Sequence, residues 1–315
     1  MRLVFMGTPA FAVSVLAGLT GPTNSNGCEV AGVYTPPDRP AGRGRQAQAS
    51  PVKEFALKHG LTVHQPASLR SAEAQAELAA LEPDAIIVAA YGKLLPSPVL
   101  ELAPLGCLNI HPSLLPRHRG PSPVATAILE GDQVTGVTLM LLNERMDTGP
   151  LIAQTKYPLN GDETADGLTE ILFGLGGELL HESLPHWQSG ELQALPQDDS
   201  LATVTRKLER ADGLADWTLT AEELERRARA FTPWPGLFTD WNGSGVKLVE
   251  VRVLPTDSDG EDKGMVVATG DSAAPAAVVT AQGLLGLKTI QLEGRRAVAV
   301  GDFLQGAPGF IGSRL

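Results

Sequence analysis

The sequence contains few cysteines and no long hydrophobic run. Its 315 residues include only Cys28 and Cys107, which lie far apart and have neither the spacing of metal ligands nor that of a disulfide framework. No stretch approaches the ~20 apolar residues of a membrane-spanning helix, and the apolar run at the start is too short for a secretory signal. We therefore expect a cytoplasmic protein in which both cysteines are buried as small hydrophobic side chains.

Two other absences concern nucleotides and nucleic acids. The dinucleotide fingerprint Gly-x-Gly-x-x-Gly and the Walker A phosphate loop are both missing, which disfavours a nucleotide-dependent enzyme. Positive charge is also scarce, because 25 lysines and arginines oppose 36 aspartates and glutamates and leave a net charge of −11. This balance argues against a general nucleic-acid coat, since non-specific binding requires neutralisation of phosphates. A local basic surface remains compatible with it.

What the chain does contain is enough apolar sequence, 43% of the residues, for a sizeable core. Its length fits two domains better than one. In the first half, apolar strand patterns alternate with helical patterns, and the strands are predicted at residues 3–6, 29–34, 61–64, 84–90, 107–110, 136–142 and 151–157. This alternation predicts an α/β domain over residues 1–189, with a Rossmann-like, mostly parallel sheet and helices on both faces.

The pattern changes after a polar segment at residues 190–207, which we interpret as a linker. A helix is predicted over 221–231, and short strands follow it, separated by turn signals such as Asp257-Ser258-Asp259-Gly260. Short strands at regular spacing are typical of small antiparallel barrels. Residues 208–315 are therefore predicted to form a second, small β domain.

The most informative motif is Asn109-x-His111, at the end of a predicted strand. Residues two apart in an extended segment project to the same side, and ligands of parallel sheets bind at the carboxyl ends of strands. An imidazole can take a proton from an attacking amine, and an amide N–H can hold the oxyanion that forms. Asp147, in the loop after another predicted strand, can orient the imidazole and stabilise its charged form. Together the three residues predict acyl transfer to an amine that the substrate supplies.

Each of these motifs also has an ordinary structural interpretation. A lone histidine is usually a surface or fully hydrogen-bonded residue, and an aspartate before Thr-Gly-Pro is a typical turn former. Ser113-Leu114-Leu115-Pro116 could be a plain loop, and the segment 35–49, with Arg39, Arg43 and Arg45, a solvated one. Loops of that length inside compact domains are nevertheless often functional, and arginines can contact phosphates bidentately. On the residues alone, both interpretations stay open.

Taken together, these motifs resemble the 10-formyltetrahydrofolate-dependent formyltransferases. The resemblance rests on Asn109-x-His111-x-Ser113-Leu114-Leu115-Pro116 combined with Asp147-x-Gly149. It begins at Val4-Phe5-Met6-Gly7-Thr8-Pro9 and ends near Arg229-Ala230-Phe231-Thr232-Pro233-Trp234-Pro235-Gly236. Over this length the chain is similar to the members of the family that act on methionyl-tRNA.

The resemblance implies transfer of the formyl group of 10-formyltetrahydrofolate to the free amino group of initiator methionyl-tRNA, which gives N-formylmethionyl-tRNA for translation initiation. It implies no metal, and we expect a monomer. Residues 208–315 would be an OB-like, tRNA-binding domain. Arg117, His118 and Arg119 add positive charge beside the catalytic loop. The implied site residues are Asn109, His111 and Asp147 for catalysis, Ser113, Leu114, Leu115 and Pro116 for the folate, and Arg39, Arg43 and Arg45 for the tRNA.

Other functions account for part of the sequence. A formyltransferase acting on glycinamide ribonucleotide would not explain the second domain, and one acting on an amino-sugar nucleotide usually comes fused to a larger partner enzyme. A formyltetrahydrofolate hydrolase, in which water replaces the amine, would use the same catalytic residues, whereas the related dehydrogenase would need a much longer chain. A catalytically silent RNA-binding protein is opposed by the intact set of Asn109, His111 and Asp147.

Overall fold

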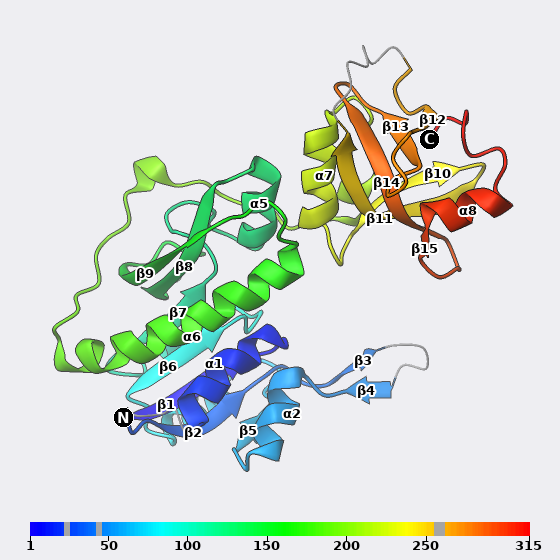
Figure 1. Ribbon diagram of the computed structural model, residues 1–315. Helices are drawn as coiled ribbons and strands as arrows, with labels where there is room; N and C mark the ends of the chain where they lie inside the picture. Colours follow the sequence, from blue (N-terminus) through cyan, green and yellow to red (C-terminus); the bar gives the residue numbers. More distant parts are fainter. Residues whose placement is uncertain (22–25, 42–45, 255–261) are drawn as a thin grey trace. The chain divides into compact units, whose positions relative to one another are not determined.

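The computed structural model describes residues 1–21, 26–41, 46–254 and 262–315, and they form two compact units (Figure 1). The first unit comprises residues 1–123, 134–158 and 169–205, and the second comprises residues 124–133, 159–168 and 206–315. Two short segments from within the predicted first domain thus belong to the second unit. The division into 1–189, 190–207 and 208–315 stays a prediction. No helix among the described residues is long and apolar enough to cross a membrane.

A seven-stranded sheet forms the centre of the first unit, in the order β5-β2-β1-β6-β7-β8-β9. The strands from β5 to β7 are parallel, whereas β8 pairs antiparallel with β7 and with β9. The predicted mostly parallel α/β sheet is confirmed, although the sequence did not predict its antiparallel edge. The strands are β1 (Arg2–Gly7), β2 (Glu29–Tyr34), β5 (Val63–His64), β6 (Ala85–Ala89), β7 (Cys107–His111), β8 (Val134–Leu141) and β9 (Leu151–Pro158).

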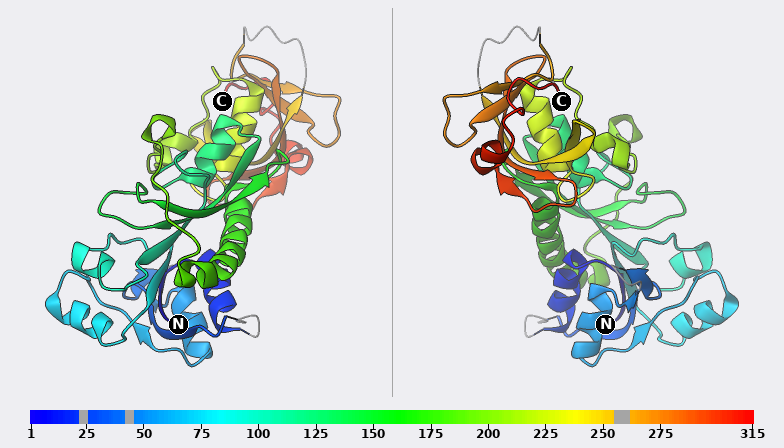
Figure 2. Two further views of the ribbon diagram at one scale, coloured as in Figure 1. Left: turned by 90° about the vertical axis from the view of Figure 1, so that its left-hand side faces the viewer. Right: turned by 90° about the vertical axis from the view of Figure 1, so that its right-hand side faces the viewer.

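Helices cover both faces of this sheet (Figure 1 and Figure 2). Leu3 and Phe5 of β1 pack in one core with α1, α2 and α6, whereas Val4 and Met6 pack in another core with α3 and α4. Because successive residues of a strand point to opposite faces, a strand buried on both sides is apolar throughout. The helices are α1 (Phe11–Thr20), α2 (Pro51–Lys58), α3 (Ala72–Ala79), α4 (Ser97–Leu100) and α6 (Ala165–Ser189).

The first two helices of the first unit begin differently. Ser50 caps α2, because its hydroxyl accepts a hydrogen bond of 3.1 Å from the backbone N–H of Lys53. Helix α1 begins at Phe11 without a side-chain cap. The Thr8 hydroxyl instead donates to the carbonyl of Tyr91, at 3.0 Å, and so ties the end of β1 to the segment after β6.

A short hairpin lies within the segment that was predicted to be a long loop. Strands β3 (Arg39–Ala41) and β4 (Gln46–Gln48) pair antiparallel, with Arg39 opposite Gln48. The residues between these strands, which include Arg43 and Arg45, lie outside the described residues.

The second unit contains an antiparallel sheet, which confirms the predicted small β domain. Its strands follow the order β10-β11-β14-β13-β12, and β15 pairs with β14. Residues of β11, β13 and β14 form its core with α7 and with Phe310. The strands are β10 (Leu237–Trp241), β11 (Ser244–Leu254), β12 (Val266–Ala268), β13 (Ala276–Val279), β14 (Leu284–Leu292) and β15 (Val298–Ala299). The helices are α5 (Pro123–Glu130), α7 (Ala221–Ala230) and α8 (Val300–Gly306), and η2 (Arg210–Gly213) is a 3-10 turn, as is η1 (Asp199–Leu201) of the first unit.

Candidate active site

Strand β7 brings Asn109 and His111 to its carboxyl end, as the sequence predicts. Asn109 lies opposite Val88 of the parallel neighbour β6 and opposite Met140 of the antiparallel neighbour β8. Its side chain is half-buried and has no hydrogen-bond partner among the described residues. The amide of Asn109 is therefore available to a ligand at this edge of the sheet.

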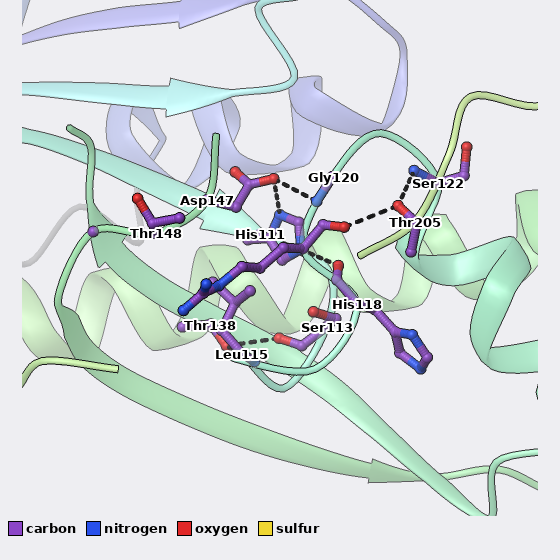
Figure 3. A network of polar contacts seen from close by, with 12 residues as sticks. His111, Ser113, Leu115, His118, Gly120, Ser122, Thr138, Asp147, Thr148 and Thr205 are labelled. Carbon is purple, nitrogen blue, oxygen red and sulfur yellow. Dashed lines mark hydrogen bonds and ion pairs between the residues drawn. The ribbon is translucent and has the colours of Figure 1, made fainter. Parts of the chain in front are cut away.

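His111 is buried, with 4% of its surface exposed. Its Nε2 atom lies 3.0 Å from the backbone carbonyl oxygen of His118 (Figure 3). A carbonyl can only accept, so Nε2 carries the proton of the neutral ring and Nδ1 is the basic nitrogen. Nδ1 lies 3.6 Å from Oδ2 of Asp147, which is an ion-pair distance rather than a good hydrogen bond. The carbonyl of His118 thus sets the tautomer of His111, and the Asp147 carboxylate lies beside the basic nitrogen.

The surroundings of His111 act on its pKa in opposite directions. Burial lowers the pKa, the negative charge of Asp147 and the hydrogen bond to the His118 carbonyl raise it, and the nearby His118 imidazole lowers it again. The net effect is a pKa below the ordinary value, because burial disfavours the charged ring most strongly. At neutral pH the imidazole is consequently uncharged and can accept a proton on Nδ1.

Asp147 lies in the loop between β8 and β9 and has a left-handed backbone, with φ of 53°. Its Oδ2 atom accepts a hydrogen bond of 2.8 Å from the backbone N–H of Gly120 (Figure 3). Gly120 has φ of 108°, and a Cβ there would lie 2.8 Å from the carbonyl oxygen of Thr205. Two loops distant in sequence thus meet at His111, and Gly120 permits their close approach.

The predicted folate loop is packed tightly against β8 and β9. Ser113 and Leu115 are buried, and the Ser113 hydroxyl donates to the Arg117 carbonyl at 2.7 Å. The hydroxyl of Thr138 donates to the Ser113 carbonyl at 2.6 Å and accepts from the Leu115 N–H at 3.1 Å (Figure 3). Gln154 donates to the Leu115 carbonyl at 2.8 Å. The backbone of this loop is therefore held rigidly, and its contact with a folate stays a prediction.

Sequence reasoning missed Thr138 and Gln154. The available signal was a polar residue inside each of two otherwise apolar or alternating strands, because a buried hydroxyl or amide needs a hydrogen-bond partner. Their partners belong to the loop after β7, which only the antiparallel pairing of His111 with Thr138 and of Thr138 with Gln154 brings near.

Arg119, which was expected to add positive charge beside the catalytic loop, is buried and ion-paired. Only 8% of its surface is exposed, and its guanidinium donates to Gln197 at 2.9 Å and to Asp199 at 2.7 Å. Both partners lie in the segment that was predicted to be a linker. The predicted tRNA residues stay predictions, because the side chain of Arg39 is not described and Arg43 and Arg45 lie outside the described residues.

A pocket of about 540 Å³ opens at the carboxyl ends of β1, β2 and β6. Its lining includes Thr8, Pro36, Asp38, Tyr91 and Lys93. The chain passes from β1 to β2 on one side and later reaches β6 on the other, so the pocket lies at the point where the strand order reverses. Strand β7, with Asn109 and His111, is the next neighbour of β6.

Sequence profiles define the class to which this fold and site belong. The formyl transferase profile matches residues 1–184, and the profile of the formyl transferase C-terminal domain matches residues 207–308. Among solved structures, the fold is similar to that of HypX from Aquifex aeolicus in complex with tetrahydrofolic acid, with a TM-score of 0.64 and 19% identity. That similarity covers 100% of this chain and 49% of HypX.

Two relatives narrow the class. Methionyl-tRNA formyltransferase of Roseiflexus sp. (strain RS-1) is 46% identical over 315 residues, which cover 100% of this chain and 95% of the relative. Methionyl-tRNA formyltransferase of Chloroflexus aggregans is 46% identical over 306 residues, which cover 97% of each chain. The chain belongs to the methionyl-tRNA formyltransferase family.

Proposed function

We propose that this protein transfers the formyl group of 10-formyltetrahydrofolate to the amino group of initiator methionyl-tRNA and thereby supplies N-formylmethionyl-tRNA for translation initiation. The observation that carries the chemistry is the buried, neutral His111, with Nδ1 3.6 Å from the Asp147 carboxylate and the free Asn109 amide on the same strand. The family supports the substrates, because relatives with 46% identity over nearly the whole chain are named for methionyl-tRNA.

In this proposal the acceptor brings the nucleophile. Its α-amino group, which titrates near pH 8, attacks the formyl carbon in its neutral form. The carbonyl π electrons move onto the formyl oxygen, and the Asn109 amide donates a hydrogen bond to the resulting oxyanion. Nδ1 of His111 takes the proton of the new ammonium group, and Asp147 stabilises the imidazolium. The intermediate then collapses, the bond from carbon to the folate nitrogen breaks, and the His111 imidazolium gives its proton to that nitrogen, which returns the imidazole to its neutral form.

The folate would lie beside Ser113 to Pro116, whose carbonyls and N–H groups are fixed by Thr138 and Gln154. Rigid backbone groups suit a pterin, which is planar and carries donors and acceptors along its edge. We propose that residues 208–315 hold the body of the tRNA, that the protein acts as a monomer in the cytoplasm, and that the reaction uses no metal.

The proposal is tested by formyl transfer from 10-formyltetrahydrofolate to initiator methionyl-tRNA, with free methionine and glycinamide ribonucleotide as competing acceptors. We expect rapid formylation of the methionyl-tRNA and little of either small acceptor, because contacts remote from the amine contribute to the rate of transfer. Equal or faster formylation of glycinamide ribonucleotide would contradict the assignment of methionyl-tRNA as the acceptor. Release of formate at the same rate without any acceptor would indicate a hydrolase.

A prediction concerns Arg43, which lies in sequence between β3 and β4. Its replacement by alanine should raise KM for methionyl-tRNA and reduce the slope of log affinity against log salt by about one, as expected when one phosphate contact is lost. Formyl-folate hydrolysis by the same variant should be unchanged. As a matched control, Arg145→Ala removes an exposed arginine of the β8–β9 loop. Equal losses in transfer and hydrolysis by Arg43→Ala would mean that Arg43 serves the folate site instead.

A further inference from the structure

Residues 197–205, which follow the last helix of the first unit, contact both loops that face His111. One end of this segment contacts the Asp147 loop through Gln197, and the other end contacts the His118 loop through Thr203 and Thr205. All these residues belong to the first compact unit. We refer to residues 197–205 as the strap.

Gln197 has every polar atom of its amide in use. Its Nε2 atom donates to the carbonyl oxygen of Asp147 at 2.9 Å and to that of Gly149 at 2.7 Å. Its Oε1 atom accepts from Nε of Arg119 at 2.9 Å. Because a guanidinium can only donate and a carbonyl can only accept, this arrangement fixes the orientation of the amide without ambiguity. Glutamine is the residue that can join one donor to two acceptors at this point.

The two carbonyls that Gln197 holds flank the turn that carries the Asp147 carboxylate. Asp147 has φ of 53°, a conformation that non-glycine residues adopt only when the surroundings hold them there. Gly149 in the same turn is packed so closely that a Cβ would lie 1.8 Å from the carbonyl oxygen of Leu141. The turn is thus constrained by packing on one side and by the Gln197 amide on the other.

The other end of the strap holds the loop that sets the tautomer of His111. The hydroxyl of Thr203 accepts from the His118 N–H at 2.8 Å, and the Thr203 carbonyl accepts from the Arg119 N–H at 2.9 Å. The backbone N–H of Thr205 donates to the Arg119 carbonyl at 2.7 Å. These bonds place the His118 carbonyl against Nε2 of His111, while those of Gln197 place Asp147 against Nδ1 (Figure 3).

We propose that Gln197 is a positioning residue for formyl transfer, which holds the Asp147 carboxylate against His111 through the carbonyls of Asp147 and Gly149. The inference rests on the proposed function only for its kinetic readout. Arg119 acts indirectly on the position of Asp147, because it orients the Gln197 amide and links it to the His118 loop. The strap is accordingly part of the active site as well as a connection along the chain.

The test uses the full-length chain with two substitutions of Gln197. Gln197→Glu keeps an acceptor for Arg119 but loses the donors to both carbonyls, whereas Gln197→Ala loses all three hydrogen bonds. Both should lower kcat roughly 10- to 100-fold, because a displacement of about 1 Å in a catalytic group has this effect. KM for folate and for methionyl-tRNA should change little. The control is Gln193→Ala, which removes an exposed glutamine that lies outside the strap and should stay within about two-fold of the parent.

A second readout does not depend on activity. The groups that face His111 are the Asp147 carboxylate and the His118 imidazole, and of these the carboxylate raises the His111 pKa. Loss of Gln197 should let the carboxylate move away, so the His111 pKa measured by imidazole nitrogen NMR should fall further below the parent value. A merely structural role would lower the melting temperature without this shift.

The possible results distinguish the positioning role of Gln197 from the proposed function. Parent-like kcat for Gln197→Glu, or an unshifted His111 titration with a raised KM for tRNA, would overturn the proposal that Gln197 positions the Asp147 carboxylate. A shifted titration without any loss of kcat would overturn it for catalysis and would also count against His111 as the base. Failure of the parent protein to formylate methionyl-tRNA would instead refute the proposed function and leave the titration result standing.

Discussion

Replacing His111 by alanine is expected to lower kcat for formyl transfer about 10²- to 10⁴-fold, the range for loss of a general base. The expected loss is large because the ring is buried and neutral, with its basic nitrogen beside a carboxylate. Single-turnover formylation of methionyl-tRNA, with enzyme in excess, measures the step directly. The melting temperature should change far less than the rate, since among the described residues the imidazole makes a single hydrogen bond, to the His118 carbonyl.

A matched control is available in His186, an exposed histidine of α6 paired with Glu191. His186→Ala should retain full activity, which would show that removal of a histidine is not harmful in itself. Turnover close to the parent rate in His111→Ala would remove the imidazole from the mechanism. Rescue of His111→Ala by added imidazole would support the role as a base.

Asp147→Asn is expected to have the second largest effect, a loss of about 10²- to 10³-fold in kcat, as for other groups that stabilise charge in a transition state. Asparagine keeps the shape and an oxygen for the Gly120 N–H but removes the negative charge. The loss should fall short of that for His111→Ala, because the His118 carbonyl continues to set the tautomer.

The direction in which Asp147→Asn shifts the pH profile of kcat can also be predicted. Asp147 raises the His111 pKa against the effect of burial, so its neutralisation should lower that pKa further. The imidazole would then stay neutral to lower pH, and the acid limb of the kcat profile should move to lower pH while its maximum falls. A limb that moves to higher pH would contradict the assigned electrostatics, as would an imidazole NMR titration that is unchanged in Asp147→Asn.

The sequence predicted the strand that ends in His111 because local rules decide it. Cys107, Leu108 and Ile110 are apolar, and the two-residue period of a strand places Asn109 and His111 on one side. The helix at residues 221–230 followed from an equally local signal, because the segment predicted as a helix over 221–231 is rich in helix-forming residues.

What the sequence did not reveal depends on contacts between distant residues. Gln197 reads as a polar linker residue, and only the folded chain places it on the carbonyls of Asp147 and Gly149. The sequence likewise shows Arg119 only as a positive charge beside the catalytic loop. In the folded chain its guanidinium donates hydrogen bonds to Gln197 and to Asp199. Composition and periodicity carry no information on such partners, because the energy of a side-chain hydrogen bond depends on position in space.

The strap also bears on how the catalytic half could be exchanged between formyltransferases. A fragment that ends with α6 at Ser189 would contain Asn109, His111 and Asp147 yet lack the donors and acceptors that hold the loops around them. In a chimera, the crossover would have to fall after Thr205 for a catalytic half to keep its own strap. A crossover before Gln197 would supply the strap from another parent. The formyl-transfer activity of the chimera would then depend on how well that strap forms hydrogen bonds with Arg119 and with the Asp147 turn.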